Sequence, residues 1–293
     1  MEYITAKDAA NLWGITERRV CTYCKEGRIM GAIKDSGIWK IPSNSAKPDR
    51  KPRKKNMVLD RILEEKKTRT SGGIYYRIQI DMAYNSNHME GSRLSHEQTR
   101  NIFETATIGI DNTILRIDDI IEATNHFRCV DEILDTVHAE LSEKYIKNLH
   151  RMLKQNTSDS RETYFALGDY KRFPNEVGGN ITTAPENVPS AMAELLKKYK
   201  AIPKKELDDL LDFHVQFEKI HPFQDGNGRV GRLILFKECL RYGVVPFIIL
   251  DDLKLYYYRG LREWGNTNGF LRDTCLTAQD HMKKYLDYFR IPY

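Results

Sequence analysis

The chain has 293 residues, of which 41% are hydrophobic and 30% charged. This balance predicts a globular protein that can bury a sizeable core and form two domains or more. No apolar run approaches the roughly 20 residues that cross a membrane, and the N-terminus lacks a signal-peptide core, so neither membrane association nor secretion is expected. Five scattered cysteines, an odd number, favour reduced thiols in a cytoplasmic protein.

Positive charge is concentrated at the N-terminus. The net charge is +5, but residues 1–56 contain 13 Lys or Arg and 6 Asp or Glu, a balance of +7, whereas the remainder contains 33 and 35. Such a split is typical of a nucleic-acid-binding module joined to a near-neutral domain. Duplex DNA is therefore an expected partner of residues 1–56.

Two short helices and a hairpin are predicted in this basic region. Thr5 is a good N-cap for a helix over residues 6–13, and Thr16 caps a second helix that runs to about Lys25. Glycines spaced for a hairpin follow within residues 29–41. Two helices joined by a glycine-containing turn form a helix-turn-helix.

This arrangement resembles the small winged-helix domains of the excisionase and MerR type, over residues 1–46. The resemblance implies a recognition helix whose basic side chains contact DNA bases or phosphates. The residues assigned to this contact are Arg18, Arg19 and Lys25. The alternative is a small domain that binds a protein or has lost its function.

A basic linker is predicted over residues 47–56, with two prolines and six Lys or Arg between Lys47 and Lys55. It is expected to be solvated, and it can also touch phosphates beside a DNA-binding module. From residue 57 onward apolar residues recur at helical spacing.

The most informative stretch is the segment of residues 221–232, which we call the motif loop. It separates an amphipathic pattern over residues 207–220 from an apolar stripe that begins at Leu233, so it is predicted to end one helix and begin the next. Its glycine-rich centre can turn main-chain N–H groups inward at the positive end of the second helix. That arrangement is an anion site suited to phosphate. The residues of this centre are Gly226, Asn227 and Gly228.

Four charged or titratable side chains complete the predicted phosphate site. Arg229 and Arg232 are three positions apart and can reach phosphate oxygens from one helix face. Asp225 is placed to hold a Mg²⁺ ion that bridges phosphates. His221, with an ordinary pKa of about 6.5, can accept a hydroxyl proton at neutral pH.

Two other interpretations of the motif loop are open. His221 alone could cap the last carbonyls of the preceding helix. The glycines at 226, 228 and 231 also match the spacing of a dinucleotide-binding fingerprint, with Asp251 about 20 residues further on. That fingerprint needs a strand before its first glycine, whereas a helix followed by His-Pro-Phe is predicted there.

The motif loop as a whole resembles the core motif of Fic-family nucleotidyl (AMP) transferases, His-x-Phe-x-Asp/Glu-Gly-Asn-Gly-Arg-x-x-Arg, at every fixed position. The resemblance implies that His221 is the general base and Asp225 the magnesium ligand. It also implies that residues 226–228 form the anion hole and that the two arginines contact the β- and γ-phosphates. The phosphotransferase branch of the family has lysine in place of Gly228, so this sequence favours AMP transfer.

A second stretch, Ser86 to Gly91, resembles the inhibitory motif of the same family, within an inhibitory helix expected around residues 83–91. The resemblance implies that Glu90 pairs with Arg232 and excludes the productive position of the γ-phosphate. Met89 stands where the family usually has isoleucine. The alternative is a solvated glutamate on a helix.

Two further segments resemble parts of the family that face the nucleotide or the target. Residues 168–180 resemble a β-hairpin flap that clamps the modified side chain, with Lys171 where the family usually has arginine. The flap residues assigned to the site are Val177, Gly178, Gly179 and Asn180. Tyr257 and Tyr258 resemble paired tyrosines that face the adenine and ribose, although helical tyrosines equally often belong to a core.

The sequence therefore predicts a mainly α protein: a Fic-type helical domain with a small β-hairpin flap, preceded by a winged helix-turn-helix module. The expected divisions are the module at 1–46, the linker at 47–56, a helical part with the inhibitory helix at 57–140, and a catalytic domain at 141–293.

The expected activity is Mg²⁺- and ATP-dependent transfer of AMP to a Ser, Thr or Tyr hydroxyl of a protein, with the chain itself a candidate target. Two alternatives are open. The same site could remove AMP by hydrolysis, or the chain could be a DNA-binding regulator whose Fic domain senses nucleotide. The sequence does not reveal the target protein, the DNA sequence or the oligomeric state.

Overall fold

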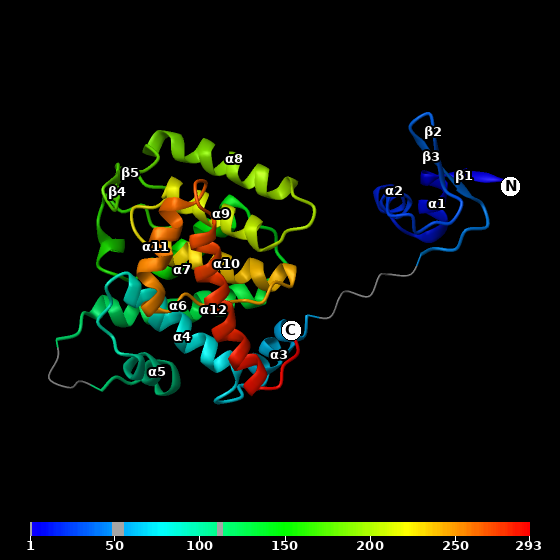
Figure 1. Cartoon of the computed structure of the whole chain (residues 1–293). Helices are drawn as coiled ribbons and strands as arrows, with labels where there is room; N and C mark the ends of the chain where they lie inside the picture. Colours follow the sequence, from blue (N-terminus) through cyan, green and yellow to red (C-terminus); the bar gives the residue numbers. More distant parts are fainter. Residues whose placement is uncertain (1, 49–55, 110–113) are drawn as a thin grey trace. The chain divides into compact units, whose positions relative to one another are not determined.

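The computed structural model describes residues 2–48, 56–109 and 114–293. The chain divides into two compact units, Met1–Lys55 and Asn56–Tyr293 (Figure 1). Most of the predicted linker, residues 49–55, lies outside the described residues. Asn56, assigned to the linker, instead begins the second unit, because its side chain caps the first helix there and donates to the Leu240 carbonyl at 2.7 Å.

The first unit contains two helices and a three-stranded antiparallel sheet in the order β1-β3-β2. The elements are β1 Tyr3–Thr5, α1 Ala6–Trp13, α2 Glu17–Lys25, β2 Ile33–Asp35 and β3 Ile38–Pro42. Thr5 and Asp8 form a capping box and the Thr16 side chain caps α2, as predicted. The strand β1 was not predicted, because three residues are too few to show an alternating pattern.

The second unit is mainly helical, as the sequence predicts. Its helices are α3 Met57–Thr68, α4 Ile74–Met89, α5 His96–Thr105, α6 Ile117–Asp135, α7 Glu143–Lys154, α8 Val188–Ala201, α9 Leu207–Ile220, α10 Asn227–Tyr242, α11 Lys254–Glu263 and α12 Gly269–Tyr288. Three short 3₁₀ turns are η1 Asp159–Arg161, η2 Pro185–Asn187 and η3 Asp251–Leu253. One hairpin, β4 Glu176–Val177 with β5 Asn180–Ile181, lies beyond one end of α8 (Figure 1).

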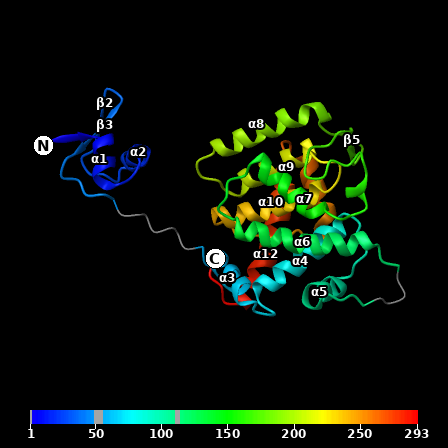
Figure 2. The same ribbon diagram turned by 180° about the vertical axis from the view of Figure 1, so that it is seen from behind.

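Helix α10 is the centre of the second unit. It packs against α9, α6, α7 and α4, and it lies among these helices when viewed from either side (Figures 1 and 2). Every residue from Arg229 to Leu240 is buried, so this helix has no polar face turned to solvent. Because α10 begins at Asn227, the core of the unit positions the motif loop directly.

The structure contradicts the dinucleotide-binding interpretation of the glycines. Gly226 follows α9 and an irregular loop, and no strand is formed within residues 221–226 or 244–250. In the described parts of the chain, no helix has the length and apolar character needed to cross a membrane.

Candidate active site

His221 ends helix α9 in a left-handed conformation. Its φ angle is 52°, and its main-chain N–H donates to the Phe217 carbonyl at 3.0 Å. A non-glycine residue in this region stores of the order of 1 kcal/mol of strain, and here it turns the chain sharply into the motif loop. Burial and the nearby charge of Lys171 lower the pKa of His221 to about 4. The imidazole is therefore unprotonated at neutral pH and able to accept a proton.

The motif loop is held by contacts within itself and with α7. Asn227 is buried; its amide oxygen accepts from the Phe223 N–H and its amide nitrogen donates to the Phe223 carbonyl, both at 2.8 Å. The Phe223 ring is fully buried and stacks on His150 with the ring centroids 4.0 Å apart. The His150 Nδ1 atom accepts from the Gly168 N–H at 3.0 Å, so its Nε2 donates to the Asp225 carbonyl at 3.1 Å.

These contacts define the role of the Asn227 side chain. Residues 226–228 are expected to bind an anion through their main-chain N–H groups, and both polar atoms of the Asn227 side chain are used to close the motif loop. What remains available to an anion at this end of α10 is the main chain, since the first N–H groups of a helix have no acceptor within the helix.

Asp225 and Arg229 belong to a charge cluster that the sequence did not predict. Lys154, which is 2% exposed, donates from Nζ to Asp225 Oδ2 and to Glu122 Oε1, both at 2.6 Å. Arg229 bridges the same two carboxylates, at 2.9 Å to Asp225 Oδ2 and 2.5 Å to Glu122 Oε2. Burial would raise the pKa of Asp225, but the charges of Arg229 and Lys154 outweigh it and hold this pKa well below its usual range.

The residues present fit a Mg²⁺ ion that is held mainly by a phosphate ligand. The Asp225 side chain is 45% exposed and ionised, which suits a hard cation. Within the described residues no group of three or more His, Cys, Asp or Glu could hold a metal by itself. Mg²⁺ is commonly bound by one or two carboxylates together with substrate phosphates, so a single carboxylate is sufficient here.

Glu90 and Arg232 form the pair that the sequence predicts. Glu90 follows the last residue of α4, and its Oε1 atom lies 2.6 Å from Arg232 Nη2. Ser86, one turn earlier, accepts from Arg232 through both its hydroxyl and its carbonyl oxygen, at 3.0 Å each. Burial would raise the pKa of Glu90, but the charges of Arg232 and Arg229 lower it overall, so the carboxylate is ionised.

The Glu90 carboxylate also lies directly against the first turn of α10. A Cβ atom added at Gly228 would collide with Glu90 Oε1 and would lie 2.8 Å from Arg232 Nη1. Glycine at this position therefore allows the carboxylate to approach the end of the helix. An anionic side chain of the protein occupies the region that was assigned to phosphate.

The two tyrosines of α11 have different environments. Tyr257 is completely buried, and its hydroxyl lies 2.6 Å from His214 Nε2, so its ring offers no face to a nucleotide in this structure. Tyr258 is 38% exposed, and burial together with the charge of Glu90 raises its pKa to about 12, which places it beside the site. Only Tyr258 matches the environment expected of a base-facing side chain.

Two buried side chains of α9 near Arg232 were not singled out from the sequence. Burial raises the pKa of Glu218 to about 7 and lowers that of His214 to about 3. Both lie on the helix that ends at His221. Their helical spacing, at three and seven residues before His221, is a signal that could have indicated them.

The predicted flap is formed by the hairpin of β4 and β5. Gly178 and Gly179 occupy its turn with φ angles of 56° and 80°, which explains the need for glycine there. Val177 and Asn180 are exposed. In the first unit, Arg18 and Lys25 are exposed on α2, whereas Arg19 donates to the Tyr23 hydroxyl at 3.3 Å.

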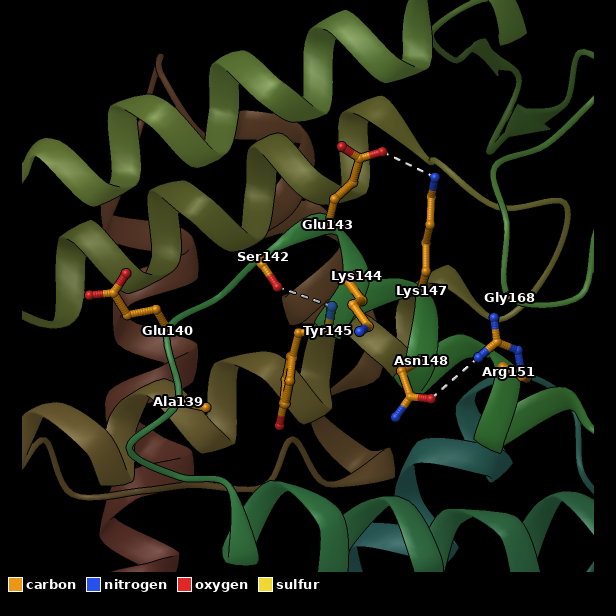
Figure 3. A pocket seen from close by; sticks show the side chains of 10 residues that line it. All are labelled: Ala139, Glu140, Ser142, Glu143, Lys144, Tyr145, Lys147, Asn148, Arg151 and Gly168. Carbon is orange, nitrogen blue, oxygen red and sulfur yellow. Dashed lines mark hydrogen bonds and ion pairs between the residues drawn. The ribbon is translucent and has the colours of Figure 1, made fainter.

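A cavity of about 760 Å³ lies along α7 and the residues that precede it. Figure 3 shows the side chains that line it. Its lining includes Lys144, Lys147 and Arg151, together with Glu140 and Glu143. None of the site residues predicted from the sequence lines it. The candidate active site is therefore the region around the motif loop and not this cavity.

Comparison with known proteins relates part of the second unit to a family. Residues 140–238 match the model of the Fic/DOC family, so the chain contains a Fic/DOC family domain. Two curated relatives are the protein adenylyltransferase fic-1 of Caenorhabditis briggsae, 26% identical over 209 residues, and the protein adenylyltransferase Fic of Aedes aegypti, 26% identical over 182 residues. The matches cover 69% and 61% of this chain but only 40% and 36% of the relatives. The chain thus spans less than half the length of these proteins.

Solved structures share the fold. A Fic domain containing signaling protein from Bacteroides thetaiotaomicron superposes with a TM-score of 0.62 at 21% identity, covering 80% of this chain and 94% of that one. Fic-1 of Caenorhabditis elegans, residues 134–508, superposes with a TM-score of 0.59 at 21% identity, covering 80% of this chain and 72% of that one. These likenesses show that the fold of the second unit is that of Fic-domain proteins.

Proposed function

We propose that the second unit is a protein adenylyltransferase that transfers AMP from ATP to a Ser, Thr or Tyr hydroxyl of a protein. The observation that carries this proposal is that His221, which is unprotonated and half-buried, belongs to the same short loop as the start of α10. The imidazole offers a base, and the first main-chain N–H groups of the helix offer an anion site. The names of the curated relatives support the same reaction.

In the proposed reaction a hydroxyl oxygen of the target attacks the α-phosphorus of ATP while His221 accepts the hydroxyl proton, and pyrophosphate leaves. The main-chain N–H groups at the start of α10 stabilise the charge that grows on the α-phosphate oxygens. Arg229 and Arg232 would bind the β- and γ-phosphates. A Mg²⁺ ion held by Asp225 would supply neutralisation of phosphate charge.

We also propose that Glu90 restrains this reaction in the structure described. Arg232 is fully engaged by Glu90 and Ser86, and the Glu90 carboxylate lies against Gly228. A γ-phosphate that approached Arg232 would meet a like charge, which repels it. Hydrolytic removal of AMP at the same site is the alternative activity, with Glu90 orienting or activating water.

The activity is tested by incubating the full chain with labelled ATP and Mg²⁺, alone and with a cell lysate, and following label by gel and intact mass. We expect incorporation of AMP that His221→Ala abolishes, while ATP binding by the same variant survives, because His221 moves a proton and holds no phosphate. Equal incorporation by wild type and His221→Ala, or an equal loss of ATP affinity, would contradict the assignment.

A second function is favoured by the first unit, for which we propose duplex DNA binding. Its support is the balance of +7 over residues 1–56 and the exposure of Arg18 and Lys25 on α2. Fluorescence polarisation with duplex DNA should show affinity that falls steeply with salt. Arg18→Ala should weaken this binding and His221→Ala should not. Absence of binding at low salt would favour a protein-interaction module.

A further inference from the structure

Lys171 lies at the base of the flap, between the hairpin and the motif loop. Its side chain is 3% exposed, and its Nζ atom donates to Asn175 Oδ1 at 2.7 Å and to Thr182 Oγ1 at 2.5 Å. Asn175 directly precedes β4 and Thr182 directly follows β5. The ammonium group therefore joins the two ends of the hairpin.

The same residues bind the main chain next to His221. The Lys171 N–H donates to the Pro222 carbonyl at 2.8 Å, and Asn175 Nδ2 donates to the Phe223 carbonyl at 3.0 Å. These two bonds hold the residues that immediately follow His221. The hairpin and the motif loop are thus fastened together through Lys171 and Asn175.

The surroundings of Lys171 are unusual for a buried cation. The two acceptors of its ammonium, Asn175 Oδ1 and Thr182 Oγ1, are neutral, and burial lowers the pKa of Lys171 to about 8. Burying a charge without a carboxylate partner is costly, so an apolar side chain would stabilise the fold better. A local arrangement that costs stability is a sign of function.

The charge of Lys171 acts on His221. Burial is the largest influence that lowers the pKa of His221, and the charge of Lys171 is the second largest. The Glu218 carbonyl, Glu90 and Asp225 act in the opposite direction, and their contributions are smaller. A positive group close to an imidazole keeps it from binding a proton.

We propose that Lys171 is a positioning residue for the reaction at His221, which fixes the flap to the motif loop and keeps the imidazole free to accept the hydroxyl proton. This role rests on the proposed function of His221 as the general base. It gives the lysine two separable tasks, one carried by its hydrogen bonds and one by its charge.

The charge is tested without any substrate, by titrating the histidine resonances of the full chain by NMR and assigning His221 from their comparison with His221→Gln. Lys171→Met should raise the pKa of His221 by on the order of one unit, and Lys171→Arg should restore the wild-type value. Because this titration does not need turnover, it reports on Lys171 even in a protein that transfers no AMP. An unchanged His221 pKa in a folded Lys171→Met variant would overturn the electrostatic role.

The hydrogen bonds are tested by AMP incorporation in a Glu90→Gly background. Thr182→Val keeps the charge of Lys171 but removes one acceptor of its ammonium group. We expect the rate of AMP incorporation to fall by about tenfold, while the acid limb of its pH profile stays at the same pH. Lys171→Met should lower the rate at least as much and move that limb to higher pH. Lys205→Met is the matched control, since Lys205 is also buried but donates to the Ile202 carbonyl outside the motif loop. Full activity in Lys171→Met and Thr182→Val would overturn the positioning role.

Discussion

Glu90 Oε1 and Arg232 Nη2 lie 2.6 Å apart although the two residues are separated by 142 positions in the sequence. Glu90 stands at the end of α4 and Arg232 in the second turn of the buried helix α10. Because α10 is fixed by the core, the pair can open only if the end of α4 moves or the glutamate side chain turns away. The contact is therefore a restraint whose removal should change the chemistry more than the fold.

We expect Glu90→Gly to raise AMP transfer by at least about tenfold. A partly shielded pair of this kind is worth about 1–3 kcal/mol, and 1.4 kcal/mol corresponds to about tenfold in rate. A larger gain follows if the freed Arg232 also corrects the position of the α-phosphate. Label incorporation into the chain itself and into a lysate, compared with wild type, measures the effect.

The control for this experiment is Glu97→Gly, which removes an exposed carboxylate on α5 that pairs with Arg100 on the same helix. It should leave incorporation unchanged. Lower or unchanged incorporation in Glu90→Gly would contradict the restraint. If Glu90→Gly also failed to remove AMP from a previously modified protein, the glutamate would have to take part in hydrolysis as well.

Lys154→Met should destabilise the second unit by about 1.5–3 kcal/mol, because it removes one of the two cations that the Glu122 and Asp225 carboxylates share and leaves both to Arg229. Urea unfolding at pH 7 measures this change. Lys198→Met is the matched comparison: its pair with Glu194 is exposed, at 74% and 65%, and should be worth less than about 1 kcal/mol. Equal losses in the two variants would show that the charge cluster contributes no more than a surface pair.

Stability should fall as the pH drops below about 6.5. Burial lowers the pKa of His126, His150 and His214 to about 3, whereas an unfolded chain has histidines near 6.5. Below that value the unfolded chain binds more protons than the native one, so each histidine can cost up to about 1.4 kcal/mol per pH unit down to its folded pKa. The contribution is fully retained above pH 6.5.

Urea unfolding of wild type and His126→Leu between pH 7 and pH 5 tests this dependence. The variant should show a shallower loss, because it lacks a group that binds a proton only in the unfolded chain. Among the described residues neither ring nitrogen of His126 has a hydrogen-bond partner, so the substitution breaks no such bond there. Parallel pH dependences for the two proteins would contradict this explanation.

The sequence predicted those features that are marked by short motifs, including one contact between two motifs that lie far apart in the chain. The capped helices of the first unit, the loop between α9 and α10, and the pair of Glu90 with Arg232 follow from short motifs and their resemblance to a family. The other members of the charge cluster around Asp225 and Arg229 could not be found in this way. Lys154 and Glu122 come from α7 and α6, and only the packing of these helices against α10 brings their charges to the motif loop.

Tyr257 shows a second limit. Adjacent residues on a helix point about 100° apart, so one of two consecutive tyrosines can face the core while the other faces a ligand, but the sequence does not say whether this happens or which of them faces the core. The structure settles this point through the contact of Tyr257 with His214, which lies on α9. The sequence alone gave no indication of that contact.

The two tyrosines should therefore respond differently to substitution. Tyr257→Phe leaves the buried His214 Nε2 atom without its partner, which should cost about 1–3 kcal/mol of stability and change ATP affinity little. Tyr258→Ala should cost less stability than truncation of a fully buried tyrosine, since Tyr258 is 38% exposed. If Tyr258 stacks on the adenine, the Tyr258→Ala substitution should weaken ATP binding by about 1–3 kcal/mol, or roughly 5- to 150-fold in Kd.

Calorimetric titration with ATP and Mg²⁺ in a Glu90→Gly background, together with urea unfolding of the same proteins, measures both quantities. Tyr256→Ala is the control, because Tyr256 is 62% exposed on the same helix and was not assigned to the nucleotide. A loss of ATP affinity in Tyr257→Phe that matches the loss in Tyr258→Ala would show that the buried hydroxyl reaches the nucleotide. An unchanged affinity in Tyr258→Ala would remove α11 from the nucleotide site, because Tyr258 is the side chain of the predicted pair that faces that site.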